Sequence, residues 1–202
     1  MHDPLLLYKK SVVQTSTLTL NPGDMYASGV TLSNGNKTVT FDSTIGGSVR
    51  GTIARSSGKW YFEVKITGIE SGSGGYTPGI GVAPSTTGLF HPWNQGGPGE
   101  LLLYSYTSNV SALLYGTAQR FSYGTYAWLN DVIGVAMDLT AKTMKFYKNG
   151  VAFNSFDYTP YSSATTFYPM ISGAAATGSN SSANLLTGTG LTYPLPSGYN
   201  AW

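Results

Sequence analysis

Cysteine is absent from all 202 residues of the chain. The protein therefore has no disulfide, no thiolate nucleophile and no metal site with cysteine ligands. Its 2 histidines, His2 and His91, stand far apart in the sequence, and no Asp-rich calcium loop is present. We therefore expect that the protein holds neither a metal ion nor another cofactor.

Charged side chains are scarce. They make up 10% of the residues, whereas about a quarter is typical of soluble proteins. The 11 basic and 9 acidic side chains leave a net charge of +2, and the basic ones are spread along the chain. Because a protein that follows a phosphate backbone needs clustered cations, nucleic acid is not an expected partner.

Long hydrophobic runs are also missing. No apolar run approaches the length that crosses a membrane, and the N-terminus shows neither the basic region nor the apolar core of a secretion signal. We expect the chain not to enter a membrane. With 26 glycines and 15 tyrosines, beside many Ser, Thr and Asn, the surface must be uncharged but polar. Such surfaces suit extracellular and virion proteins, because hydroxyls and aromatic faces make adaptable contacts.

Beyond the first fifteen residues the sequence has the pattern of β-strands, and no segment has a helical period. Residues 59–66 alternate, so that Phe62 and Val64 share one face of a strand and Glu63 lies on the other. On that second face a lysine from a neighbouring strand is the expected partner of Glu63. We expect residues 79–83 to form a strand beside 59–66, since their glycines permit close packing.

Two Asn-Gly dipeptides predict hairpins. Asn149-Gly150 follows the apolar run 131–140 and a short alternating segment, and Asn-Gly readily takes the two positive φ angles of a type I′ turn. Asn34-Gly35 gives the same signal between two other alternating segments. The segment 21–24, Asn-Pro-Gly-Asp, is typical of a further turn.

These segments, in this order, resemble the markers of the SPRY domain family. The similar segments are Ser-Gly-Lys-Trp-Tyr-Phe-Glu-Val at 57–64, Gly-Ile-Gly-Val-Ala at 79–83, 130–139, 145–151 and Phe-Tyr-Pro-Met-Ile-Ser at 167–172. The resemblance implies an all-β fold, an antiparallel two-sheet β-sandwich of the concanavalin A-like or jelly-roll-like kind. It covers residues 16–202, and residues 1–15 form an N-terminal arm outside it. The side chains expected between the sheets are Trp60, Phe62, Val64, Val135, Met137 and Phe146.

The kind of SPRY domain that the sequence resembles bears on function. Leu32-Ser33-Asn34-Gly35 and Leu195-Pro196-Ser197-Gly198-Tyr199 are similar to SPRY modules of bacteriophage tail and other virion proteins. This similarity implies a non-enzymatic structural and binding protein, located in the bacteriophage particle. The expected partners are other virion proteins, and a host-surface glycan, a host-surface protein and a second copy of the chain are further candidates.

Aromatic residues in loops are the candidate contacts to a ligand. Residues 84–99 form a long Pro- and Gly-rich loop whose aromatic side chains either contact a partner or cap the core. The candidate ligand-binding residues are Tyr76, Phe90, His91, Trp93, Asn94, Tyr123, Tyr126 and Trp128. In the arm, the apolar patch Leu5, Leu6, Leu7 and Tyr8 is the candidate anchor to another subunit.

Two alternatives stay open beside this hypothesis. A virion-borne glycan hydrolase on the same scaffold would need two facing carboxylates, for which Glu63, Glu100 and Asp131 are the candidates. An intracellular protein-interaction adaptor is the other. We expect no catalytic residues, because His91 has no nucleophile elbow beside it and Asp131 and Asp138 have the positions of strand-end caps.

Overall fold

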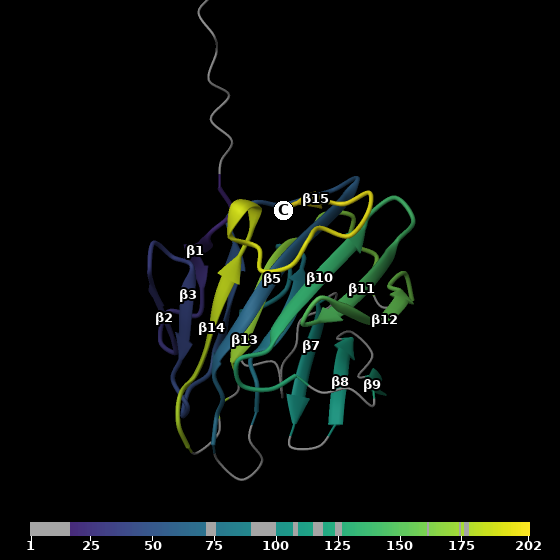
Figure 1. The fold of residues 1–202 in the computed structure, drawn as a ribbon. Coiled ribbons are helices and arrows are strands. Elements are labelled where there is room, and N and C mark those ends of the chain that lie inside the picture. The colour runs from purple at the N-terminus through teal and green to yellow at the C-terminus, as the bar shows by residue number, and fades with distance from the viewer. Residues whose placement is uncertain are drawn as a thin grey trace, which may run out of the picture.

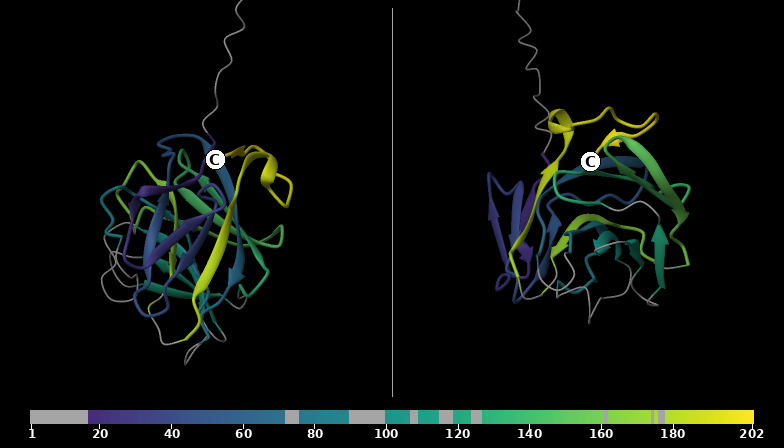
Figure 2. Two further views of the ribbon diagram at one scale, coloured as in Figure 1. Left: turned by 90° about the vertical axis from the view of Figure 1, so that its left-hand side faces the viewer. Right: turned by 60° about the horizontal axis from the view of Figure 1, so that its bottom comes forward.

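The computed structural model describes residues 17–71, 76–89, 100–106, 109–114, 119–123, 127–160, 162–173, 175 and 178–202. Two antiparallel β-sheets pack face to face in these residues (Figures 1 and 2), which confirms the predicted sandwich. In the residues described, the regular structure is β apart from one short 3-10 helix, η1 (Gly188–Gly190). Within the described ranges no helix is long and apolar enough to cross a membrane.

The first sheet has the strand order β1-β4-β13-β6-β7-β8-β9, and the second has the order β12-β11-β10-β5-β14-β3-β2 with β15 beside β5. The strands of the first are β1 (Leu20–Met25), β4 (Gly47–Gly51), β6 (Gly79–Ala83), β7 (Leu101–Tyr106), β8 (Asn109–Leu114), β9 (Gln119–Tyr123) and β13 (Tyr168–Gly173). Those of the second are β2 (Val30–Ser33), β3 (Thr38–Phe41), β5 (Lys59–Gly68), β10 (Val132–Asp138), β11 (Thr143–Lys148), β12 (Val151–Asp157), β14 (Ser181–Leu186) and β15 (Asn200–Ala201).

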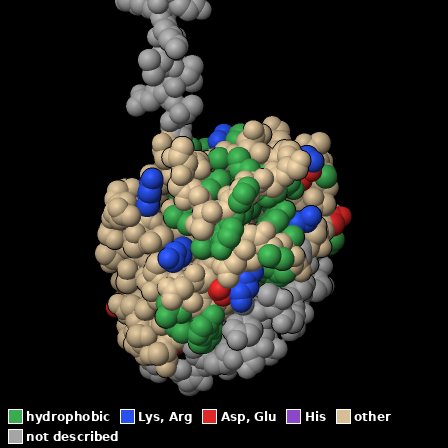
Figure 3. Space-filling model, in the orientation of Figure 1, with side chains coloured by type: hydrophobic (Ala, Val, Ile, Leu, Met, Phe, Trp, Pro, Cys, Tyr) green, Lys and Arg blue, Asp and Glu red, His purple; other side chains and the backbone are tan. Residues whose placement is uncertain are grey.

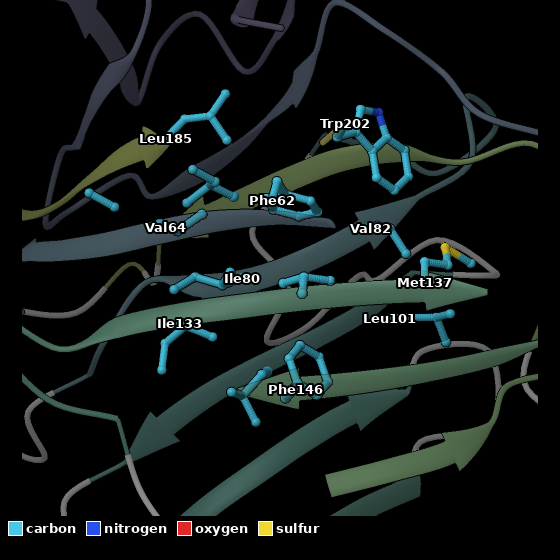
Figure 4. Close-up of a cluster of buried hydrophobic side chains, with 14 of the residues drawn as sticks. Phe62, Val64, Ile80, Val82, Leu101, Ile133, Met137, Phe146, Leu185 and Trp202 are labelled. Atoms are coloured by element: carbon cyan, nitrogen blue, oxygen red, sulfur yellow. The ribbon is translucent and has the colours of Figure 1, made fainter. Parts of the chain in front are cut away.

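The core lies between the two sheets, where the alternating residues of β5 and β10 point inward (Figure 4). Phe62 and Val135 face each other across the β5–β10 ladder, and Val135 pairs with Phe146 of β11. Five of the six predicted core side chains are fully buried, namely Phe62, Val64, Val135, Met137 and Phe146. Trp60 is only half-buried, because it lies near the start of β5; the Arg55 side chain covers one face of its ring.

The strand partners differ from two expectations. Residues 79–83 form β6, which pairs with β13 and β7 in the first sheet and not with β5. Strand β5 pairs with β10 and β14 instead. Residues 21–24 lie inside β1, where a register shift against β4 accommodates the Asn-Pro-Gly-Asp sequence without a chain reversal.

Both Asn-Gly hairpins are confirmed. Asn149 and Gly150 have φ angles of 50° and 79° between β11 and β12, as a type I′ turn requires. Asn34 and Gly35 have φ angles of 51° and 61° between β2 and β3. Because these signals depend on two adjacent residues, the sequence was sufficient to locate both turns.

Replacing Gly150 by valine should lower the free energy of unfolding by about 1–3 kcal/mol, because a β-branched residue is strained at positive φ. A Cβ at Gly150 would also lie 2.7 Å from Cδ1 of Tyr193. Gly188→Val is the matched control, since Gly188 has a φ of 57° but no atom within 4 Å of the added Cβ. Urea unfolding should show a larger loss for Gly150→Val. Equal losses would show that the contact with Tyr193 contributes nothing.

A C-terminal segment crosses the outer face of the second sheet. This strap, residues 191–199, leaves η1 and leads into β15, which pairs in parallel with β5. Figure 3 shows the same face, where hydrophobic side chains gather near the centre and lysines and arginines are scattered around them. Leu195 of the strap is 42% exposed, so the strap adds apolar surface to this face.

The strap corrects the expectation for Glu63, which is fully buried and forms no ion pair with a lysine of the described residues. Its carboxylate accepts hydrogen bonds from the backbone N–H groups of Thr192 and Tyr193, at 2.6 and 3.2 Å, and from the Tyr61 hydroxyl at 2.9 Å. The residue opposite Glu63 on β10 is Gly134, which leaves room for the Tyr61 ring. Glu63 therefore fastens the strap to the sheet.

Candidate functional site

Two of the eight predicted contact residues, Tyr76 and Trp128, belong to one end of the sandwich, where β5 ends and β10 begins (Figure 1). We call this region the loop end and define it as residues 69–71, 76–78, 127–131 and 149–151. It joins the two sheets, because residues 69–78 lead from β5 of the second sheet to β6 of the first. Loops at such an end are free to present side chains while the strands hold their bases.

The turn that carries Trp128 is tightly held. The N–H of Asp131 donates to the Trp128 carbonyl at 3.0 Å, and the Trp128 N–H donates to Oδ2 of Asp131 at 2.8 Å. Asn130 has a φ of 71°, a conformation that asparagine tolerates better than most residues. Two backbone hydrogen bonds of 2.9 and 3.0 Å join Asn130 and Asp131 to Ile66, so the turn is fixed on the end of β5.

Asp131 also joins this turn to the β11–β12 hairpin. Its Oδ1 accepts a hydrogen bond of 2.8 Å from the Asn149 side-chain amide, and its Oδ2 forms an ion pair of 3.1 Å with Lys148. Oδ1 of Asn149 accepts in turn from the N–H of Val132 at 2.8 Å. This confirms the expected strand-end role of Asp131, and it makes two separate turns into one rigid unit.

Two aliphatic side chains are exposed on this unit. Leu129 is 42% exposed and Val151 is 70% exposed, whereas Trp128 is half-buried. Held on rigid turns, such side chains can enter a partner's pocket with little loss of conformational entropy. Neither aliphatic residue was among the sequence candidates, because only their neighbours, Asn149-Gly150 and Asp131, gave a recognisable signal.

Tyr76 belongs to the same end. Its backbone N–H and carbonyl form two hydrogen bonds with those of Glu70, at 3.1 and 2.9 Å, and its side chain is half-buried. Tyr123 is the last residue of β9, the strand that leads toward the Trp128 turn. The structure thus places Tyr76 and Trp128 at the loop end and leaves their contact with a ligand a prediction.

The other sequence candidates lie outside the described residues. These are Phe90, His91, Trp93, Asn94 and Tyr126, together with Leu5, Leu6, Leu7 and Tyr8 of the arm. The loop 84–99 leaves β6 at its Ala83 end, whereas Tyr76 precedes the opposite end of that strand. Because a five-residue strand spans about 16 Å, the base of this loop and the loop end belong to different surfaces.

The base of the loop 84–99 contains an ordered charged group. Arg50 is buried, pairs with Asp24 through two hydrogen bonds of 2.8 and 2.9 Å, and donates to the carbonyls of Pro84 and Thr87 at 3.2 and 2.7 Å. Burial raises the pKa of Glu100 at the other side of the loop to about 8, although the positive charge of Arg50 opposes this shift. The hydrogen bonds of Arg50 fix the backbone on which the loop begins.

The three carboxylates of the hydrolase alternative do not form a free pair. Glu63 is fully buried beneath the strap with three donors, and both oxygens of Asp131 are bound within the loop end. Glu100 precedes β7 in the other sheet. In the described part of the chain there is also no group of three His, Asp or Glu side chains that could hold a metal ion. Among the described residues, the loop end therefore presents exposed apolar side chains, and the carboxylate oxygens of Asp131 are already occupied.

Comparison with known proteins gives one family. The SPRY domain family model matches residues 59–187, which is well over half of the chain. No curated protein is significantly similar in sequence. Among solved structures, stonustoxin is 20% identical with a TM-score of 0.60, over 85% of this chain but only 27% of the stonustoxin chain. This chain thus spans about a quarter of stonustoxin.

Two SPRY domains are similar over nearly their full length. The SPRY domain of human HERC1 is 15% identical with a TM-score of 0.59, over 82% of this chain and 96% of that domain. The PSpry domain of TRIM65 is 14% identical with a TM-score of 0.59, over 84% of this chain and 89% of that chain. At these identities the structural likeness concerns the fold.

Proposed function

This chain belongs to the SPRY domain family, and we propose that it is a non-enzymatic module that binds a protein partner through the loop end. The observation that carries the proposal is the exposure of Leu129 and Val151 on two turns that Asp131 and Asn149 lock together. Exposed apolar side chains on a rigid base can be buried by a partner with little loss of conformational entropy. The occupied carboxylates described above give no comparable support to a hydrolase.

We further propose that the module is part of a bacteriophage particle. The low content of charged residues and the similarity of 32–35 and 195–199 to virion SPRY modules support this location. In this hypothesis the arm, residues 1–15, attaches the domain to another virion protein, and the loops face a protein or glycan of the host surface. Mass spectrometry of purified particles tests it: recovery of the chain at a fixed copy number is expected, and its presence only in the host cell would favour the adaptor alternative.

Replacing Leu129 by aspartate should slow adsorption of particles to host bacteria at least tenfold, since a charge at an apolar contact removes an anchor worth about 1.4 kcal/mol or more. Leu195→Asp is the matched control, because Leu195 has the same 42% exposure but lies on the strap. Both variants should enter particles normally and unfold at the wild-type midpoint. Equal adsorption by the two variants would contradict binding through the loop end.

A further inference from the structure

A cavity lies at the opposite end of β5 from the loop end. Its volume is about 480 Å³, which is within the range of sites for small ligands. The cavity opens between Thr17, η1 and β15. Of these, η1 and β15 lie together at the top of the sandwich in Figure 1. Its wall includes Arg55, Trp60 and Trp202, and none of the described residues that line it is acidic.

Arg55 is held in place at this cavity by contacts on both sides. Its backbone forms two hydrogen bonds of 2.9 Å with that of Phe167, which is fully buried. Its guanidinium carbon lies 3.6 Å from the centre of the Trp60 ring, a cation–π contact. Trp60 is fixed as well, since its Nε1–H donates to the Ser57 carbonyl at 2.6 Å.

The guanidinium of Arg55 has no acceptor among the residues that the structure describes. Its Nε is buried and makes no hydrogen bond, and no carboxylate forms an ion pair with the side chain. Burial lowers the pKa of Arg55, and no neighbouring acid offsets this effect. The Arg55 side chain as a whole is only partly buried, so an anion that enters the cavity would meet its terminal N–H groups, which have no acceptor among the described residues.

The remaining groups of the cavity can bind the uncharged part of a ligand. Asn200 lies opposite Trp60 in the parallel pair of β15 and β5. It is exposed, and its side-chain amide offers both a donor and an acceptor. The floor is rigid, because Trp202 donates from Nε1 to the Ile53 carbonyl at 2.8 Å and accepts from Thr187 Oγ1 at 3.0 Å. The cavity thus combines one fixed cation, a polar amide and aromatic walls.

From this arrangement we propose that the cavity binds the carboxylate group of a small polar ligand, with Arg55 as the binding cation and Asn200 contacting the adjacent polar group. A planar guanidinium matches a carboxylate through two parallel N–H···O bonds. A single arginine suits a monoanion better than a phosphate, which usually engages several cations or backbone N–H groups. The ligand class is therefore an acidic sugar or an acidic amino acid residue. This site is separate from the loop end and does not rest on the function proposed there.

The test is a titration of the whole chain, followed by the NMR signal of the Trp60 indole N–H. The probes are sodium glucuronate and N-acetyl-aspartate, with glucose and N-acetyl-asparagine as their neutral counterparts and inorganic phosphate as the competing anion. We expect one of the two carboxylates to shift the signal with a dissociation constant of about 1–10 mM, a value in keeping with a ligand of this size. Tighter binding of glucuronate would identify the ligand as an acidic sugar, and tighter binding of N-acetyl-aspartate would identify it as an acidic amino acid residue.

Two variants and a control decide the role of the residues. Arg55→Gln removes the cation, and Asn200→Asp adds a negative charge to the cavity while leaving the stacking of Arg55 on Trp60 intact; each should weaken binding at least tenfold. Lys145→Gln changes the net charge equally on the outer face of β11 and should leave the dissociation constant within twofold. The proposal is overturned if neither carboxylate binds the wild type below 20 mM (about twice the upper expected value), if phosphate binds more tightly, or if both cavity variants bind like wild type.

Discussion

Phe62→Ala should lower the free energy of unfolding by about 3–5 kcal/mol, the largest loss we expect from any single substitution in this protein. Phe62 is fully buried at the centre of β5, and its ring meets that of Trp202 edge-on with 5.6 Å between the ring centres. Removal of the ring leaves a cavity bounded by both sheets, and the rigid ladder between β5 and β10 limits its collapse.

Urea unfolding followed by far-UV circular dichroism measures this loss. Leu195→Ala is the control, because a partly exposed side chain on the strap should change the free energy of unfolding by only about 0.5 kcal/mol or less. If Phe62→Ala unfolds at the wild-type midpoint, then the inward face of β5 has been assigned wrongly.

Glu63→Ala should have the next largest effect, a loss of about 2–4 kcal/mol together with release of the strap. The substitution leaves the N–H groups of Thr192 and Tyr193 and the Tyr61 hydroxyl without their acceptor, and each buried donor left unpaired is unfavourable by about 1–3 kcal/mol. Chymotrypsin should then cleave the chain after Tyr199, at the end of the strap, much faster than in the wild type, because a released strap is open to proteolysis.

Two further substitutions distinguish the loss of the Glu63 carboxylate from a general disturbance of β5. Glu63→Gln keeps an acceptor oxygen and should lose less stability than Glu63→Ala. Lys65→Ala alters the next residue on the same face of β5, where the side chain is half-buried, and should leave the strap protected. Identical cleavage of Glu63→Ala and Lys65→Ala would show that the strap is held by other contacts.

Local signals in the sequence were enough for much of this fold. Alternation within residues 59–66 identified the inward side chains Phe62 and Val64, and the Asn-Gly dipeptides located two turns, because each pattern depends on neighbours along the chain. Alternation does not encode which strand lies alongside. For this reason 79–83 was expected next to 59–66 although it forms part of the other sheet.

The features missed from the sequence depend on residues far apart in the chain. Glu63 has the position of an exposed strand residue, but the strap that buries it lies 129 residues further on. The cavity beside Arg55 likewise needs Asn200, which β15 brings to Trp60. At the loop end Trp128 was a candidate by its residue type, whereas Leu129 and Val151 could be found only from their exposure.

Site-specific photo-crosslinking in intact particles tests binding through the loop end most directly. A benzophenone side chain is placed at position 129 in one variant and at position 195 in the other, two positions of equal exposure in the wild type. Irradiation of particles mixed with host bacteria should join one defined partner protein to position 129 and none to position 195. Crosslinks from position 195 alone, or the same products from both positions, would contradict the proposal that this module binds its partner through the loop end.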